Sequence, residues 1–302
     1  MKVGVTGATG FIGRHVLAAL EAGGDEVCAL VRNSSTLPDV ETRAIDFSDT
    51  NGLEGRLDEV LAGLDAVVHG AAHVPADYND PSEARLCLEV NALGTLALLE
   101  ASKRAELVKV AVYSGNVYRF GSDPVDEDGP IYPSARAPYY MISKACADFY
   151  ADAVLREGKL DIAILRPAAV YGPGLGRGMI PRFIARLESR QSVVIKDADG
   201  YRADLVYVED VAAATVTALH ESMTGPFNLG SGTTSTPLEI ARTLVELLDV
   251  PKDLIEVRTA RETEPMGFSP LNIQRARGAF GYQPRSMRQG LSDYVDWWRT
   301  QS

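Results

Sequence analysis

A strand, a glycine-spaced turn and a helix follow one another at the start of this chain, in the sequence VGVTGATGFIG of residues 3–13. Gly7 permits a tight turn off the strand, Gly10 lets bare backbone approach a phosphate, and Gly13 lets the helix pack close to the sheet. The unpaired N–H groups and the dipole at the start of the helix favour a diphosphate. The motif therefore predicts a dinucleotide-binding α/β fold, with a glycine-rich turn that binds nothing as the alternative.

Strand-like runs alternate with helical patterns through the first half of the chain, which predicts a parallel sheet with helices on both faces. The runs typical of strands are 2–6, 26–31, 42–45, 66–69, 109–113 and 161–165, and those typical of helices are 11–21, 52–62, 82–104 and 139–157. After about residue 167 the pattern changes to short strands, loops rich in glycine and proline, and helices near 211–221, 237–248 and 287–299. We expect residues 1–166 to form a Rossmann-type doubly wound parallel sheet that carries the cofactor and the catalytic residues. Residues 167–302 are expected to form mainly a smaller C-terminal α/β substrate-binding lobe, with some segments returning to the first sheet.

Composition argues against several kinds of partner. A net charge of −11 over 302 residues disfavours a polyanion-binding surface, so we expect no nucleic-acid partner. Apolar stretches fall short of the roughly 20 residues that a membrane span needs, and the N-terminus has the pattern of a core strand instead of a signal peptide. The three cysteines, Cys28, Cys87 and Cys146, lack the spacing of a metal site. We expect a cytoplasmic protein with no metal site and no membrane partner.

Tyr140 and Lys144 are four residues apart in a predicted helix, so both side chains share one face. A tyrosine that acts as a general base near neutral pH needs its pKa lowered from about 10, which burial opposes and a nearby positive charge favours. This spacing alone is also common on solvated helices. Ser114 follows an apolar run and is expected at the carboxyl end of a strand, where doubly wound sheets bind ligands. Its hydroxyl there can hold a substrate oxygen while Tyr140 exchanges a proton, with a strand-end cap as the alternative.

These motifs together resemble the extended branch of the short-chain dehydrogenase/reductase superfamily, specifically the sugar-nucleotide epimerases and dehydratases. The resemblance runs nearly from end to end. Its motifs are TGATGFIG at 6–13, VVHGAA at 67–72, DP at 80–81, NALGT at 91–95, Ser114, Tyr140 with Lys144, RPAAVYGP at 166–173, VYVED at 206–210 and NLGSG at 228–232. So many motifs in the same order make a chance match improbable.

The resemblance implies a nicotinamide dinucleotide and a catalytic trio of Ser114, Tyr140 and Lys144. In this family the tyrosine takes the proton of a sugar hydroxyl while hydride passes to the nicotinamide, and the lysine also binds the nicotinamide ribose. The expected cofactor-binding residues are Gly7, Thr9, Gly10, Phe11, Ile12, Gly13, Arg32, Asp46, Phe47, Ala71, Ala72, Asn91, Tyr140, Lys144 and Pro167. Family members often dimerise through the two long helices that match 82–104 and 139–157, so we expect a homodimer.

The end of the second predicted strand favours NADP over NAD. Enzymes that bind NAD usually place an acidic residue there, hydrogen-bonded to the ribose 2′-hydroxyl. This chain has Arg32, with Arg14, Ser34 and Ser35 as candidate helpers, and an arginine can hold a 2′-phosphate through charge-assisted hydrogen bonds. The alternative is a solvated arginine in an enzyme that uses NAD.

The residues after Ser114 narrow the reaction. The dehydratases of this family carry Asp-Glu between the catalytic hydroxyl residue and the Val-Tyr pair, whereas this chain has Gly115 and Asn116. The glutamate of the related decarboxylases and the cysteine of the 3,5-epimerising members would also fall at Asn116, so neither chemistry is supported. Two outcomes remain: a 4-epimerase that takes and returns the hydride, and an NADPH-dependent reductase of a 4-keto sugar nucleotide. A non-catalytic dinucleotide sensor is disfavoured by the retained trio.

The substrate side departs from the family pattern. Many sugar-nucleotide members have Asn at Ala169 and a diphosphate-binding Arg at Ala203, where this chain offers Arg202 one residue early and Arg261 further on. The expected substrate-binding residues are His73, Ser114, Asn116, Tyr140, Ala169, Arg202 and Arg261. If neither arginine reaches the pocket, a smaller carbonyl substrate, as in the relatives that resemble dihydroflavonol reductase, becomes the stronger expectation.

Overall fold

A computed structural model describes residues 1–32, 37, 39–115, 117–118, 121–132, 137–196, 201–258 and 266–301 of the chain. Its centre is a seven-stranded sheet in the order β10-β6-β5-β4-β1-β2-β3, in which every neighbouring pair is parallel. The strands are β1 (Lys2–Thr6), β2 (Glu26–Val31), β3 (Glu41–Ala44), β4 (Ala66–His69), β5 (Lys109–Tyr113), β6 (Asp161–Pro167) and β10 (Gly225–Leu229). The predicted doubly wound parallel sheet is confirmed. Its order reverses between β1 and β4, the place where such sheets bind ligands.

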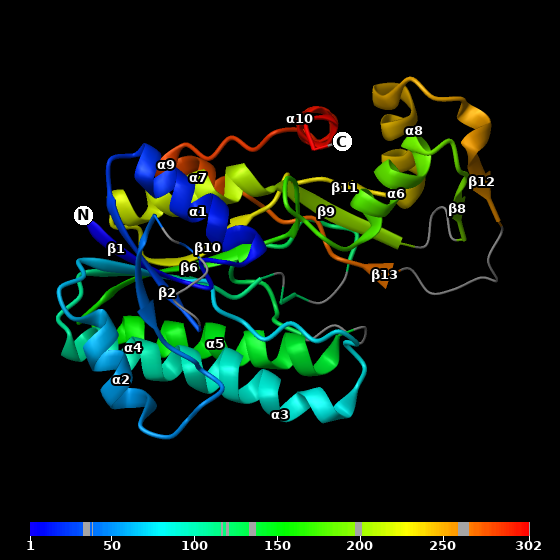
Figure 1. Cartoon of the computed structure of the whole chain (residues 1–302). Helices are drawn as coiled ribbons and strands as arrows, with labels where there is room; N and C mark the ends of the chain where they lie inside the picture. The colour runs from blue at the N-terminus through cyan, green and yellow to red at the C-terminus, as the bar shows by residue number, and fades with distance from the viewer. Residues whose placement is uncertain are drawn as a thin grey trace.

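Helices cover both faces of this sheet, as Figure 1 shows. One face carries α1 (Phe11–Ala22), α7 (Val208–His220) and α9 (Gln274–Phe280), and the other carries α2 (Leu53–Leu61), α4 (Gly94–Arg104) and α5 (Pro138–Arg156). Neighbouring strand residues therefore belong to different cores: Val68 packs with α1 and Val16, whereas Val67 packs with Leu57 and Leu98. This two-sided burial explains why the inner strands are continuous hydrophobic runs.

The helix expected over 82–104 is interrupted. It is built from a 3-10 turn η2 (Pro81–Glu83), a short α3 (Ala84–Cys87), a π-helical turn η3 (Leu88–Leu93) and then α4. Asn91 lies in the π-helical turn, and such turns are frequent at functional sites because the extra residue redirects side chains. Gly94 follows, where a Cβ would come within 2.9 Å of the Phe47 ring. The prediction of one regular helix was wrong at this turn.

The second half of the chain divides between two places. Strand β10 and helix α7 belong to the large sheet, while a smaller unit is built around β9 (Tyr201–Tyr207), which pairs with β7 (Ala169–Tyr171), β11 (Thr234–Ser235) and β13 (Met266–Gly267). Strands β8 (Val193–Ile195) and β12 (Ile255–Val257) form a separate pair. Helices α6 (Met179–Glu188), α8 (Pro237–Leu248) and α10 (Met287–Arg299) share the core of this unit. The last two begin at capping boxes, Thr236 with Glu239 and Ser286 with Gln289, and have the predicted bounds.

The described helices include none that is both long enough and apolar enough to cross a membrane.

Candidate active site

The glycine turn after β1 is shaped by backbone contacts that leave no room for side chains. Gly7 has a φ of +67°, and a Cβ there would lie 2.7 Å from the backbone of Gly70. A Cβ on Gly13 would lie 2.1 Å from the carbonyl oxygen of Gly7, so α1 could not pack as closely with any other residue. Gly10 precedes Phe11 without a side chain to cap the helix, which leaves the first helical N–H groups available to an anion. This cradle fits the diphosphate of a dinucleotide.

A buried chain of hydrogen bonds links β1, β4 and α4 beneath this turn. The Ala71 N–H donates to Thr6 Oγ1 (3.0 Å), which lies 2.8 Å from His69 Nδ1, while His69 Nε2 lies 3.0 Å from Thr95 Oγ1. Thr95 Oγ1 donates to the carbonyl of Asn91 (2.6 Å), so it must accept from His69, and the imidazole carries its proton on Nε2. Burial, together with the charge of Lys144, lowers the pKa of His69 to about 3. The ring is therefore a neutral structural link, as expected for a histidine at the end of a core strand.

Asn91 joins the loop after β4 to α5, the helix that carries Tyr140 and Lys144. Its Oδ1 accepts from the His73 N–H (2.7 Å), and its Nδ2 donates to the His73 carbonyl (3.0 Å) and to Ser143 Oγ (2.9 Å). Ser143 directly precedes Lys144 in α5. The His73 imidazole contacts the Glu83 carboxylate. Asn91 thus fixes α5 against the strand ends.

Ser114 stands immediately after β5, at the carboxyl end of the strand as predicted. Its N–H donates to the Leu165 carbonyl (3.0 Å), which continues the pairing with β6. Only 2% of the residue is exposed. Among the described residues, its Oγ is the one buried side-chain oxygen or nitrogen without a hydrogen-bond partner. An unpaired buried hydroxyl lowers the stability of the folded protein by about 1–3 kcal/mol, so a bound ligand that hydrogen-bonds to this oxygen would remove that cost.

Tyr140 and Lys144 lie on the first turns of α5, and the rings of Tyr78 and Tyr140 pack edge to face with their centroids 5.7 Å apart. Burial raises the pKa of the Tyr140 phenol, and the neighbouring Tyr78 and Cys87 act in the same direction. Lys144 Nζ donates to the carbonyl of Tyr113, and burial lowers its pKa to about 8. The lysine is therefore close to titration at neutral pH, while the phenol still requires positive charge to ionise.

The residues expected around the adenosine lie beyond the ends of β2 and β3. Arg32 is exposed and stands close enough to Asp46 for its charge to act on that carboxylate. Burial disfavours the ionised Asp46, but hydrogen bonds from the Ser48 hydroxyl and N–H outweigh this and hold its pKa below the usual range. Phe47 is a core residue, 5.2 Å from the His69 ring. Arg14 donates to the carbonyls of Thr9 and Gly10, and Ser34 and Ser35 lie outside the described residues.

The remaining expected cofactor residues surround the strand ends. Pro167 is the buried last residue of β6, while Ile12, Ala71 and Ala72 are partly buried at the mouth of the turn. Within the described residues there is no group of three or more potential metal ligands.

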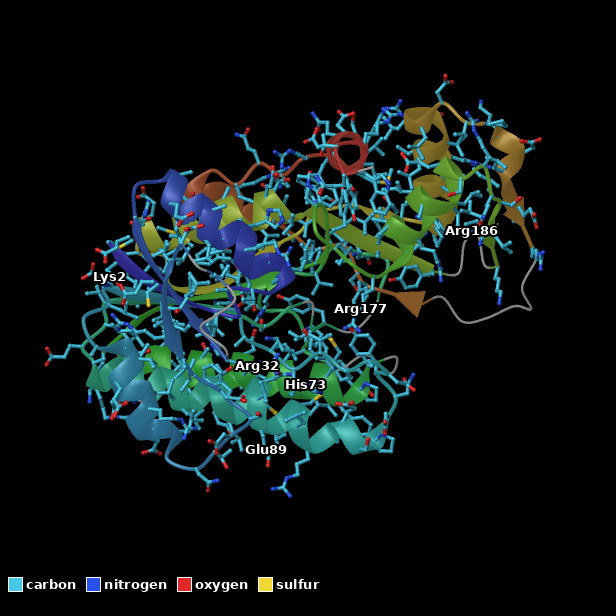
Figure 2. The ribbon with its side chains drawn as sticks, viewed as in Figure 1. Lys2, Arg32, His73, Glu89, Arg177 and Arg186 are labelled. Carbon is cyan, nitrogen blue, oxygen red and sulfur yellow. The ribbon has the colours of Figure 1, made fainter. Side chains whose placement is uncertain are left out.

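A cleft of about 1430 Å³ opens between the two parts of the molecule and includes Tyr140 in its wall. From the Rossmann part it is lined also by Tyr78 and Met141. From the C-terminal lobe it is lined by three exposed cations, Arg182 and Arg186 of α6 and Lys196 after β8. Figure 2 shows His73 and Arg32 on the Rossmann part and Arg186 on the lobe. The cleft thus brings Tyr140 and a cationic surface together.

Several residues expected to bind substrate are placed differently. Arg202 is exposed on β9 and Ala169 is partly buried on β7, and neither is among the described residues that line this cleft. Asn116 and Arg261 lie outside the described residues. Four residues that line the cleft were not predicted from the sequence, namely Tyr78, Arg182, Arg186 and Lys196. The signal for two of them was present, since arginines at a spacing of four on an amphipathic helix share a face.

Comparison with known proteins gives consistent matches. The family model described as "NAD dependent epimerase/dehydratase family" matches residues 3–230. A dTDP-glucose 4,6-dehydratase of Streptomyces niveus is 30% identical, over 99% of this chain and 93% of its own. The solved structure of MoeE5 in complex with UDP-glucose and NAD is 27% identical with a TM-score of 0.84, covering 100% of this chain and 99% of the other. The solved complex of the Thermus thermophilus UDP-glucose 4-epimerase with NAD is 29% identical with a TM-score of 0.83 and 99% coverage of both chains.

Proposed function

This chain belongs to the NAD-dependent epimerase/dehydratase family, as its motifs predicted, and from that premise we propose that it is a sugar-nucleotide epimerase. The proposed reaction is reversible hydride transfer at a sugar carbinol, at C4 of a nucleoside diphosphate hexose. Membership makes the chain an enzyme that uses a nicotinamide dinucleotide. The sugar, the direction of the chemistry and the choice of dinucleotide are our proposals.

The unpartnered Ser114 hydroxyl is the observation that carries the proposal. It is buried at a strand end on the ligand side of the sheet, and a sugar C4 oxygen bound there would satisfy it. Tyr140 would then take the proton of the same hydroxyl, and Lys144 would stabilise the phenolate by its charge. A bound nicotinamide would supply the hydride acceptor and donor that this reaction needs. No second acid/base pair is needed for this sequence of steps.

A 4,6-dehydration is not supported, although a 30% identical relative bears that name. The acid/base pair that the elimination requires would occupy positions 115 and 116, which are Gly115 and Asn116 here. A 4-keto reductase uses the same trio and remains the second candidate, favoured by the basic Arg32. A smaller carbonyl substrate or a non-catalytic sensor fits less well, because the cleft has both Tyr140 and a cationic wall.

The cationic wall supports a diphosphate-bearing substrate. Arg182, Arg186 and Lys196 line the cleft that also includes Tyr140, in a chain whose net charge is −11. Positive charge gathered at one site of an acidic protein favours an anionic ligand. We propose that these side chains hold the diphosphate and that the C-terminal lobe, mainly residues 167–302, provides the substrate side of the enzyme, with residues 1–166 providing the cofactor side.

The choice of dinucleotide follows from Arg32. An exposed arginine after β2 can donate charge-assisted hydrogen bonds to a 2′-phosphate, and this supports our proposal that NADP binds more tightly than NAD. The similar solved structures named above contain NAD, and a preference for NAD in binding measurements would reject this role of Arg32.

We also propose a cytoplasmic homodimer. The two long helical segments expose large apolar side chains on the surface, namely Leu88, Leu93, Ile142 and Phe149. Exposed apolar residues gathered on neighbouring helices mark protein interfaces more often than chance. The change Phe149→Glu is expected to convert a dimer to a monomer in light scattering, and a wild-type monomer would contradict the proposal.

The deciding experiment is to incubate the purified protein with a panel of sugar nucleotides, with NAD and NADP supplied separately. Mass spectrometry and proton NMR then identify the product. An epimerase gives a C4 epimer of unchanged mass without net consumption of the cofactor. Stoichiometric oxidation of NADPH with a keto sugar would instead establish the reductase.

A further inference from the structure

A buried ion pair lies one helical turn beyond the catalytic lysine. Arg166 on β6 and Asp148 on α5 are 4% and 1% exposed. The pair is bidentate: Arg166 Nε donates to Asp148 Oδ2 (2.8 Å) and Nη2 donates to Oδ1 (2.7 Å). Both carboxylate oxygens are thus occupied by one planar fork, the strongest geometry available to this pair.

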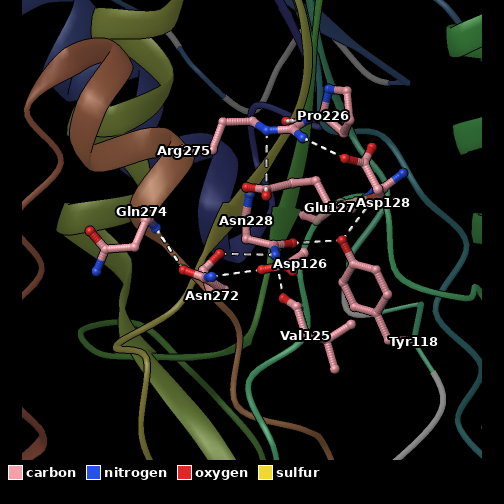
Figure 3. A network of polar contacts seen from close by, with 11 residues as sticks. Tyr118, Val125, Asp126, Glu127, Asp128, Pro226, Asn228, Asn272, Gln274 and Arg275 are labelled. Atoms are coloured by element: carbon pink, nitrogen blue, oxygen red, sulfur yellow. Dashed lines mark hydrogen bonds and ion pairs between the residues drawn. The ribbon is translucent and has the colours of Figure 1, made fainter.

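The third nitrogen of Arg166 reaches the segment that follows Ser114. Nη1 donates to Tyr118 Oη and to the Glu127 carbonyl, both at 2.6 Å. The contacts continue outward, as Figure 3 shows: Tyr118 Oη donates to Asn228 Oδ1 (2.7 Å), and the Asn228 N–H donates to Glu127 Oε1 (2.9 Å). Arg166 is therefore a polar link between the Ser114 segment and the helix of Tyr140 and Lys144, beside the apolar cluster of Val117 with Met141 and Ala145.

Asp148 would compete for Lys144 if it were free. The two residues are four apart on α5 and both are buried, which is the spacing of an ion pair on one helix face. Lys144 Nζ nevertheless bonds the Tyr113 carbonyl. The titratable groups that interact with this ammonium are Asp148 from α5 and His69 from β4, and Arg166 from β6 is paired with Asp148.

We propose, on the premise of the function proposed above, that Arg166 is a positioning residue for the reaction. It holds the Ser114 segment against α5, and it occupies both oxygens of Asp148, so that the Lys144 ammonium remains available to the phenol of Tyr140.

The first test follows Lys144 itself and needs no substrate. The protein is labelled with [ε-13C]lysine, the Lys144 signal is assigned with Lys144→Arg, and its titration is followed by NMR. In Arg166→Gln, the freed Asp148 carboxylate is expected to raise the Lys144 midpoint by about one unit or more. In Asp148→Asn/Arg166→Gln, which removes both charges, the midpoint is expected at or below the wild-type value. Arg156→Gln breaks an exposed ion pair with Asp152 on the same helix and is the matched control, with no shift expected.

The second test measures turnover of the sugar nucleotide identified by the screen. Arg166→Gln is expected to lower kcat about 10- to 100-fold and to move the rising limb of the pH profile upward by about one unit, with KM within about threefold. The double variant is expected to return the limb to its wild-type position. Should Arg166→Gln fail to fold, Arg166→Lys keeps the charge without the fork and is expected to show a smaller shift in the same direction.

Tyr118→Phe separates the two parts of the proposal. It removes one contact to the Ser114 segment and leaves the ion pair intact, so the Lys144 titration is expected to be unchanged while kcat falls about 3- to 10-fold. An unchanged Lys144 midpoint in the single variants Arg166→Gln and Arg166→Lys, or an unchanged kcat in Tyr118→Phe, would overturn the proposal. Absence of turnover in the wild type, with the Lys144 shifts as expected, would reject the proposed function and leave the electrostatic role of Arg166 standing.

Discussion

The two sides of the cleft are built in opposite ways. On the proposed cofactor side, the site is built from the backbone of the glycine turn and from buried side chains that hydrogen-bond to one another through His69. On the substrate side, Arg182, Arg186 and Lys196 are exposed and stand on a single helix and a strand end of the smaller lobe. Under the proposed function, the fold itself fixes the coenzyme site, whereas substrate choice depends on exposed side chains that can change without altering the fold.

Removing the phenolic oxygen of Tyr140 tests the proposed proton transfer in the cleft between the two sides. Tyr140→Phe is expected to lower kcat by about 10² to 10⁴ because the reaction loses its general acid/base. Binding of the dinucleotide, measured by calorimetry, is expected to stay within about threefold of wild type. A variant that keeps its full rate would show that another group moves the proton, and unchanged behaviour in every assay would favour a sensor.

Adding one methyl group tests the cofactor side. Gly13→Ala places a Cβ 2.1 Å from the Gly7 carbonyl oxygen, so the turn must shift and the affinity for the dinucleotide is expected to fall about 30-fold or more. The control is Gly55→Ala in α2, where a Cβ would meet nothing within 4 Å. That change is expected to leave the affinity unchanged and to stabilise the helix by about 0.5–1 kcal/mol. Equal affinities in the two variants would mean that the turn does not hold the diphosphate.

Replacing Lys144 tests whether its buried ammonium destabilises the folded protein. Burial holds its pKa at about 8 against an ordinary value of 10.5, so below pH 8 the folded protein carries a charge that the unfolded chain solvates better. The pKa shift corresponds to a destabilisation of the folded protein by roughly 3 kcal/mol. Replacing Lys144 removes this cost but also loses the hydrogen bond to Tyr113, which offsets roughly 1 kcal/mol of the gain. Lys144→Met without cofactor is therefore expected to raise the free energy of unfolding by about 2 kcal/mol at pH 7.

The pH dependence provides the control for this variant. Between pH 8 and 10.5 the unfolded wild type binds more protons than the folded protein, so wild-type stability rises with pH through that window. The advantage of Lys144→Met, measured by urea unfolding, is expected to shrink accordingly. A less stable variant at pH 7 would show that the ammonium is well solvated or fully paired in the native protein.

The same contrast explains what could be predicted from the sequence. The glycines, the strand that ends at Ser114 and the spacing of Tyr140 and Lys144 are local patterns, and each was placed correctly because the local backbone determines it. The π-helical turn at Asn91 was missed because the local sequence pattern is that of a regular helix. The cations of the cleft were not predicted for a related reason. Whether Arg186 or Arg202 lines the cleft depends on how the C-terminal lobe packs against the Rossmann part, and the local sequence around each residue does not determine that.

The smallest expected effect concerns these exposed cations and tests the substrate side alone. Arg182→Gln/Arg186→Gln is expected to raise KM for a sugar nucleotide about 10-fold, with kcat within about threefold, because the lost contacts hold the diphosphate equally in the ground and transition states. The effect is expected to decrease as salt is raised, since solvent-exposed charges are screened. Arg202→Gln is the informative control: a change in KM of less than about threefold is expected, because Arg202 does not line the cleft among the described residues. A larger rise in KM from Arg202→Gln than from the double variant would place the diphosphate beside β9 instead of beside α6.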